Sequence, residues 1–188
     1  MLVIRSQAAP IGVAKSPHVH LELIGGDADG RILARSMLGE RVSVGPLFVP
    51  KDELRAAISR SHVVAGIFGT SDKAARVVPY KVVHALAHGR PVVTASTPAI
   101  RRLLSPGVDC VTAPAGDADA LADVLEALAT DPGRLQAIGT AARQRFERSF
   151  APRVVADRLD AAISSRLGLG RVARPRLLPG PSFQAVTS

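Results

Sequence analysis

The chain has 188 residues, 47% of them hydrophobic and only 3% aromatic, and it carries a formal net charge of +8. This length holds one ordinary domain with a tail and excludes a second domain of similar size. A single cysteine excludes an internal disulfide, and no apolar run approaches the roughly 20 residues of a membrane-spanning helix. Since the first residues also lack the pattern of a secretory signal, we expect a soluble, cytoplasmic protein.

The positive charge favours anionic ligands such as nucleotides and phosphates. No acidic residue precedes Glu22 and none follows Asp160, so much of the excess charge lies at the two ends of the chain. Few aromatic side chains are present for base stacking, and the sequence has no RNA-binding aromatic motif, zinc-finger spacing or helix-turn-helix pattern. Nucleic acid is therefore not an expected partner.

From His20 onward, short aliphatic runs alternate with amphipathic segments. In chain order this pattern predicts strands at residues 19–24, 41–44, 63–68, 91–95 and 108–112, and helices at 32–38, 51–60, 79–88, 117–129, 132–146 and 153–167. Aliphatic strands separated by helices indicate parallel βαβ units. We therefore predict an α/β fold with a doubly wound parallel sheet and C-terminal helices.

The segment 66–94 is predicted to run from a strand through a cationic loop into a helix and a second strand. Pro79 suits the first position of that helix, and Lys73, Arg76 and Lys81 lie around its start. First-turn N–H groups lack intrahelical partners and carry the positive end of the helix dipole, so an anion there is stabilised. Lys81 opposes this dipole unless an anion compensates it, which favours a diphosphate site.

The same segment contains an extended motif, Gly69-Thr70-Ser71-x-Lys73-Ala74-x-Arg76-Val77-x-Pro79-x-Lys81-Val82, followed by Ala85-Leu86-Ala87-x-Gly89-Arg90-Pro91-Val92-Val93. Shorter motifs lie at Leu23-Ile24-Gly25, Val42-x-Val44-Gly45 and Pro114-x-Gly116-Asp117. On these motifs the sequence, from about residue 19 to 163, resembles the C-terminal, donor-binding domain of retaining glycosyltransferases of the GT-B fold, group 1 type. Members of this family have two Rossmann-like domains with the active site between them, and only the C-terminal domain is matched here.

The resemblance implies a division of the chain. Residues 19–167 would form the Rossmann-like nucleotide-sugar-binding domain, residues 1–18 a degenerate or truncated first βα unit, and residues 168–188 a disordered basic tail rich in Pro and Gly. In the family, a Gly-Arg pair and a downstream Lys near the start of the domain grip the donor diphosphate. Arg5 and Lys15 are the only candidates here, but no glycine precedes Arg5, so these roles are not assigned.

The resemblance also implies binding roles for the residues of the motif. Gly69 and Thr70 would offer a backbone N–H and a hydroxyl to the sugar or the phosphate. Lys73, Arg76 and Lys81 would hold the diphosphate. The alternatives are an ordinary turn for the first pair and solvated charges for Lys73 and Arg76.

Many relatives have two glutamates eight positions apart, of which the first touches the sugar and the second accepts hydrogen bonds from the ribose hydroxyls. Arg76 and His84 occupy these positions here. A neutral imidazole has one acceptor and one donor, so its ribose contact would be weaker than that of a carboxylate. The alternative is that His84 is an ordinary helix residue. Leu47, with Phe48, lies where the family holds the base, unless the two form an apolar loop lid.

The implied function is transfer of a sugar from a nucleoside-diphosphate sugar with retention of configuration, and this chain would supply the donor-binding half. No catalytic residue is assigned, because the acceptor-side groups belong to the other domain. The alternative is a non-catalytic nucleotide-binding or interaction module. No cofactor and no metal are expected, since His84 and His88 lie four residues apart without a third ligand.

The last predicted helix has an apolar stripe, formed by Val154, Val155, Leu159, Ala162 and Ile163. In the family, the final helices return across the cleft to the N-terminal domain. We therefore expect, besides the nucleotide-sugar donor and an unidentified acceptor, one of three partners for this stripe: a chain carrying the N-terminal domain, a second copy, or an acidic membrane surface. The third would place the protein at the inner face of the membrane.

Overall fold

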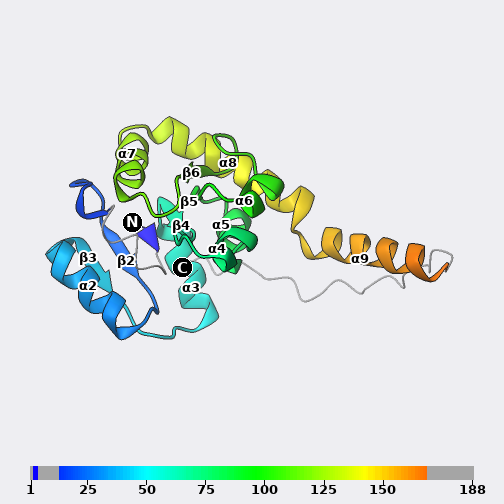
Figure 1. The fold of residues 1–188 in the computed structure, drawn as a ribbon, viewed down its shortest axis with the longest axis horizontal. Helices are drawn as coiled ribbons and strands as arrows, with labels where there is room; N and C mark the ends of the chain where they lie inside the picture. The colour runs from blue at the N-terminus through cyan, green and yellow to red at the C-terminus, as the bar shows by residue number, and fades with distance from the viewer. Residues whose placement is uncertain (1, 4–12, 169–188) are drawn as a thin grey trace, which may run out of the picture. The chain divides into compact units, whose positions relative to one another are not determined.

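The computed structural model describes residues 2–3 and 13–168, with the backbone alone at 2–3. The chain separates into two compact units, residues 1–151 and 152–188. The first unit contains a six-stranded sheet (Figure 1). Its strands are β1 Leu2–Val3, β2 Leu21–Leu23, β3 Val42–Val44, β4 Val63–Ala65, β5 Val92–Ala95 and β6 Val111–Ala113.

All strand pairs of this sheet are parallel, in the order β3-β2-β1-β4-β5-β6. This is the strand order of a doubly wound Rossmann-like sheet, and the predicted fold class is confirmed. The last strand begins later than predicted, at Val111 instead of residue 108. Asp109 is the reason, because its carboxylate accepts a hydrogen bond from the Ser105 backbone at 2.7 Å and from Arg145 at 2.6 Å, which closes a turn before the strand.

The helices are α2 Ala28–Leu38, η1 Gly39–Arg41, α3 Lys51–Arg60, α4 Asp72–Arg76, α5 Tyr80–Ala87, α6 Pro98–Leu103, α7 Ala118–Ala129, α8 Pro132–Ser149 and α9 Pro152–Leu167. The α2 helix starts four residues before its predicted start, because the Asp27 side chain caps it by accepting from the Gly30 N–H at 2.7 Å. The short helices α4 and α6 were not predicted. Ser71 and Thr97 cap them, and neither is long enough to show an apolar stripe.

The apolar core lies on both faces of the sheet. On one face, buried residues of α2, α7 and the start of α8 pack against strand residues such as Val63 and Ala65. On the other face, α3, α5, α6 and the middle of α8 pack against Val64 and Val92. Adjacent residues of one strand thus belong to different clusters, because successive side chains of a strand point to opposite faces of the sheet. Both faces are covered by helices, which explains why the strands are apolar without alternation.

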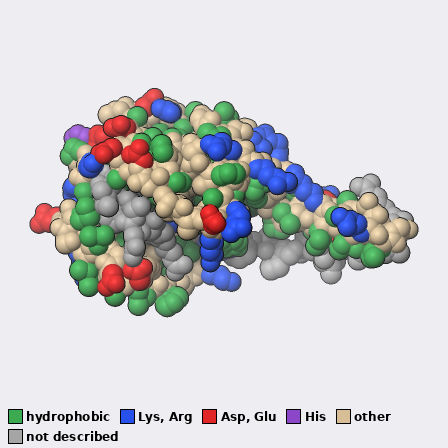
Figure 2. Space-filling view, in the orientation of Figure 1, with side chains coloured by type: hydrophobic (Ala, Val, Ile, Leu, Met, Phe, Trp, Pro, Cys, Tyr) green, Lys and Arg blue, Asp and Glu red, His purple; other side chains and the backbone are tan. Residues whose placement is uncertain are grey.

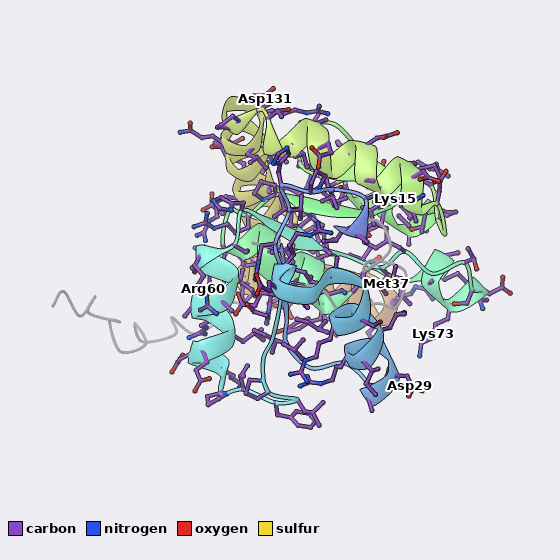
Figure 3. The ribbon with its side chains drawn as sticks, turned by 90° about the vertical axis from the view of Figure 1, so that its left-hand side faces the viewer. Lys15, Asp29, Met37, Arg60, Lys73 and Asp131 are labelled. Carbon is purple, nitrogen blue, oxygen red and sulfur yellow. The ribbon has the colours of Figure 1, made fainter. Side chains whose placement is uncertain are left out.

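The parallel strands place all their carboxyl ends at one edge of the sheet and all their amino ends at the other. Figure 3 shows this arrangement: Asp29 and Lys73, which follow β2 and β4, lie on the right, and Arg60 and Asp131 lie on the left. Ligands of doubly wound sheets bind outside the carboxyl ends of the strands. A ligand site is therefore expected at the carboxyl edge of this sheet.

The start of the chain contributes to this sheet. The β1 strand pairs with both β2 and β4, and Val13 and Ser16 are fully buried. Lys15 forms an ion pair with Asp119 of α7. The predicted division of the chain at residues 18 and 167 remains a prediction. Arg5 and the predicted tail, apart from Gly168, lie outside the described residues.

The α9 helix belongs to the second unit, and none of its described residues is buried. Val155, Leu159, Ile163 and Leu167 are 45–64% exposed. The space-filling view shows hydrophobic side chains along this helix (Figure 2). No helix in the described part of the chain combines the length and the apolar character needed to cross a bilayer.

Candidate functional site

The carboxyl end of β4 comes unusually close to β5. The Gly66 N–H donates to the Val93 carbonyl at 2.7 Å, and a Cβ atom on Gly66 would overlap the hydroxyl of Thr94. The hydroxyl of the buried Thr94 accepts a hydrogen bond from the Ile67 N–H at 3.3 Å and donates one to the Ile67 carbonyl at 3.2 Å. Only glycine fits this position, and the contact fixes the point at which the chain leaves the sheet toward the predicted site.

A second close contact joins the loops that follow β4 and β6. The Gly116 N–H donates to the Phe68 carbonyl at 2.9 Å. Gly116 has a φ of 75°, and a Cβ there would lie 2.8 Å from Thr70 Cγ2. The sequence did not predict a site role for Gly116, since its neighbour Thr70 is 46 positions away. The loop that follows β6 thereby supports the loop of Gly69 and Thr70 on one side. Gly69 is half-buried, and Thr70 is exposed to solvent.

The predicted cationic loop contains a helical turn, α4. The Ser71 hydroxyl caps it by accepting from the Ala74 N–H at 3.3 Å. Lys73 and Arg76 are both exposed on it, and the Lys73 side chain extends away from the ribbon in Figure 3. Arg76 Nε donates to the Asp72 carbonyl at 3.2 Å, which leaves its terminal nitrogens outside that bond. Both cations therefore sit on a short ordered helix instead of a loop.

The α5 helix begins one residue later than predicted. Pro79 is its N-cap residue with extended backbone, ψ 145°, and not its first helical residue. Lys81 is the second residue of the helix and is half-buried, and the first turn contains no acidic residue. The structure thus places a cation in the first turn of α5, at the positive end of the helix dipole, where a bound anion is also favoured.

His84 lies one turn further along α5. Its ring centroid is 4.1 Å from that of Tyr80, whose side chain is exposed. Burial, and then the positive charge of Arg55 on α3, lower the pKa of His84 below its ordinary value of 6.5. The imidazole is therefore neutral at pH 7, and a neutral ring has one nitrogen acceptor.

The ends of β2 and β3 are held together by one side chain that sequence analysis missed. Arg31 of α2 donates to the Gly25 carbonyl at 3.0 Å and to the Gly45 carbonyl at 2.8 Å. Leu47 and Phe48 follow in the same loop and are 51% and 86% exposed. A cation in the first turn of a helix was the available signal for Arg31, but the helix start was predicted too late for that signal to be seen.

The predicted site residues thus come from the loops after two strands, β3 and β4, and from two helices, α4 and α5. Gly69 and Thr70 adjoin α4, Lys81 and His84 lie on α5, and Leu47 lies separately, in the loop after β3. Their contacts with a ligand remain predictions. No group of three or more His, Cys, Asp or Glu in the described segments is arranged to hold a metal ion.

The fold resembles solved glycosyltransferase structures of the GT-B type. HepE from Anabaena in complex with UDP-glucose has a TM-score of 0.72 at 17% identity, over 87% of this chain and 48% of that one. Sucrose-phosphate synthase from Thermosynechococcus elongatus has a TM-score of 0.69 at 20% identity, over 89% and 45%. The chain therefore spans about half the length of these two proteins.

A separate C-terminal domain gives a more complete match. The C-terminal domain of the group 1 glycosyl transferase LpcC from Francisella tularensis has a TM-score of 0.61 at 13% identity, over 79% of this chain and 84% of that one. No curated protein matches the sequence. The model of the family described as glycosyl transferase-like matches residues 12–161, most of the chain, and the chain therefore belongs to that family.

Proposed function

We propose that this chain is the donor-binding half of a retaining glycosyltransferase and holds a nucleoside-diphosphate sugar at the carboxyl edge of its sheet. The observation that carries the proposal is the loop from Gly66 to Thr70. Gly66 against Thr94 and Gly116 against Thr70 fix its backbone, while Thr70 itself is exposed. A fixed, open loop between a strand end and two cation-bearing helices suits a diphosphate.

The chemical contribution of such a site is positioning and charge neutralisation. A departing nucleoside diphosphate gains negative charge as the bond to the sugar breaks. Lys73, Arg76 and the start of α5 at Lys81 supply positive charge and N–H groups for it. No general base is assigned in this chain, and in this proposal the groups that bind the acceptor come from the N-terminal domain.

The nucleoside would extend from the diphosphate toward α3. Tyr80 and His84 lie on α5, Arg55 of α3 is close enough to lower the pKa of His84, and Leu47 and Phe48 are exposed in the loop before α3. The complexes of HepE with UDP and with UDP-glucose support a nucleotide sugar as the ligand class. A ribose hydroxyl would donate one hydrogen bond to the acceptor nitrogen of His84.

One observation favours the alternative, a nucleotide-binding or interaction module without transferase activity. A neutral His84 cannot accept from both ribose hydroxyls as a carboxylate can. Weak donor binding without turnover is what this alternative predicts. The proposal predicts that the chain binds donor and that activity requires the missing domain.

Calorimetric titration of the chain with UDP-glucose and with GDP-mannose tests the proposal. Saturable binding of either donor is expected, and its absence for both would contradict the donor site. Once the chain is joined to its N-terminal domain, proton NMR of the product tests retention. The anomeric configuration of the donor should persist in the product, and an inverted product would rule out retention.

A further inference from the structure

The amino edge of the sheet, opposite the candidate donor site, has a cavity of its own. It measures about 610 Å³ and lies where β4 and β5 begin, under the first turns of α8. A Cβ atom on Gly139 of α8 would lie 2.5 Å from the Gly89 carbonyl, so the helix and the turn before β5 touch through two glycines. This wall of the cavity is therefore closely packed. In Figure 3 this edge is marked by Arg60 and Asp131.

The lining of this cavity is positively charged. It includes Arg90, Arg143, His62 and His88, and none of the described residues that line it is acidic. The remaining polar lining is neutral amide and hydroxyl. Arg90 and Arg143 on one concave surface attract an anion. The pKa values of His62 and His88 are lowered from 6.5, so these two rings can donate hydrogen bonds as neutral imidazoles.

Arg90 is the most informative of these side chains. Its Nε atom is buried and has no hydrogen-bond partner among the residues that the structure describes. A buried guanidinium N–H without an acceptor costs free energy, and native structures rarely leave one unexplained. A bound anion would supply the missing acceptor. Arg143, by contrast, already donates to Glu147 at 2.8 Å and to the Ala87 carbonyl.

The surroundings of His88 agree with an anion site. Burial, and then the neighbouring His84, Arg55, Arg143 and Arg90, lower the pKa of His88. Every charged neighbour that acts on it is basic. Its Nδ1 is 3.1 Å from the hydroxyl of Ser59, which can donate to it, and the other ring nitrogen then carries the proton and can donate to an anion.

A second cavity of about 340 Å³ adjoins the first and shares His62, Pro132 and Leu135 with it. Its lining is largely apolar, with Val63, Leu125 and Leu128 among its residues. The two cavities together therefore offer a cationic end and an apolar end. An inorganic anion would use only the first, whereas an anion with an organic group could use both.

We propose that the amino edge carries a second anion-binding site, in which Arg90, His88 and Arg143 bind the phosphate of a phosphomonoester and the adjoining cavity takes its apolar group. The diphosphate loop at Gly69 and Thr70 and this site lie at opposite edges of the sheet, and His84 and His88, one turn apart along α5, mark where the two sites come nearest. A nucleotide sugar has a diphosphate without a free monoester end, so the two sites differ in the ligand that they select.

Amide NMR of the isotope-labelled chain tests this, with inorganic phosphate and butyl phosphate as the two probes. Saturable shifts are expected at the N–H groups of Gly89, Gly139 and Thr140. Butyl phosphate should bind about tenfold more tightly, because its chain buries apolar surface. Equal affinity would overturn the assignment of the apolar cavity, and no saturable shift with either probe would overturn the site.

Four variants separate this site from non-specific binding. Arg90→Gln should weaken phosphate binding at least tenfold, the effect of one charge-assisted hydrogen bond, whereas Arg35→Gln on α2, which changes the net charge equally, should not. Gln136 is exposed at the cavity rim, so Gln136→Glu should weaken binding and Gln136→Lys should strengthen it without touching the core. Equal weakening by Arg35→Gln, or no effect of Arg90→Gln and Gln136→Glu, would refute the site.

Lys73→Ala makes the test independent of the proposed donor site. It should leave the phosphate-induced shifts at Gly89 and Gly139 unchanged. If Lys73→Ala abolishes them, phosphate is bound at the carboxyl edge and the second site does not exist. If the donor site is wrong instead, UDP-glucose fails to bind while butyl phosphate still does.

Discussion

The two edges of the sheet present positive charge in different ways. At the carboxyl edge, glycine contacts hold the loop backbone in place, and the cations stand on short helices beside it, two of them exposed. At the amino edge, histidines and arginines from separate segments line cavities, and one guanidinium has a buried nitrogen with no hydrogen-bond partner in the described part of the chain. The carboxyl edge offers backbone donors on a fixed loop, as this fold generally does, whereas the amino edge depends on arginine and histidine side chains.

The largest effect is expected for Gly66→Ala, which tests whether the carboxyl edge depends on backbone approach. The added methyl group would overlap the buried Thr94, so we expect a loss of about 3 kcal/mol in unfolding free energy. Gly69→Ala is the matched control, because the nearest atom to its Cβ is 3.8 Å away. Urea unfolding of both variants measures the difference. Equal stabilities would mean that the close approach is not a constraint.

Replacing Lys73, Arg76 or Lys81 by Ala tests the charges of the same edge. Each change should weaken UDP-glucose binding by about 1–3 kcal/mol, the range of charge-assisted hydrogen bonds. Calorimetry on the three variants measures it. UDP-glucose is preferred to UDP, since the free phosphate end of UDP could also occupy the amino edge. Unchanged affinity in all three variants would show that the diphosphate does not bind at this edge.

His84→Glu is expected to give a smaller effect of opposite sign. A carboxylate can accept from both ribose hydroxyls, so the affinity for nucleotides should rise by up to about 1.5 kcal/mol relative to that for pyrophosphate. The ratio of the two affinities isolates the ribose when both are measured from the amide NMR shifts of Gly69 and Thr70 at the carboxyl edge. A ratio that stays constant or falls would show that His84 does not face the ribose, and the alternative of an ordinary helix residue would then hold.

The fold was largely predictable and the contacts within the sites were not. Buried parallel strands are continuously apolar, and α3 has the bounds that its pattern predicted. The two bonds of Arg31 span 6 and 14 positions, and they were missed because the start of α2 was predicted too late. The pairing of Gly116 with Thr70 joins residues 46 positions apart, so no local pattern shows it. The same holds for His62 and Arg90, which sequence analysis could consider only as separate residues.

The smallest effect on donor binding is expected for changes in α9. Leu159→Glu with Ile163→Glu should leave UDP-glucose affinity unchanged and should abolish self-association of the chain, because both side chains are exposed and apolar. Light scattering over a dilution series measures the second effect. A native chain that is monomeric at every concentration would contradict self-association and leave a different partner for this helix.

The most direct test of the account is an amide NMR map of UDP-glucose on the chain. Binding at the carboxyl edge predicts saturable shifts at the N–H groups of Gly69, Thr70 and Gly116, with Gly89 and Gly139 unaffected. Saturable shifts confined to Gly89 and Gly139, or no saturable shift anywhere, would contradict the assignment of the donor to the carboxyl edge.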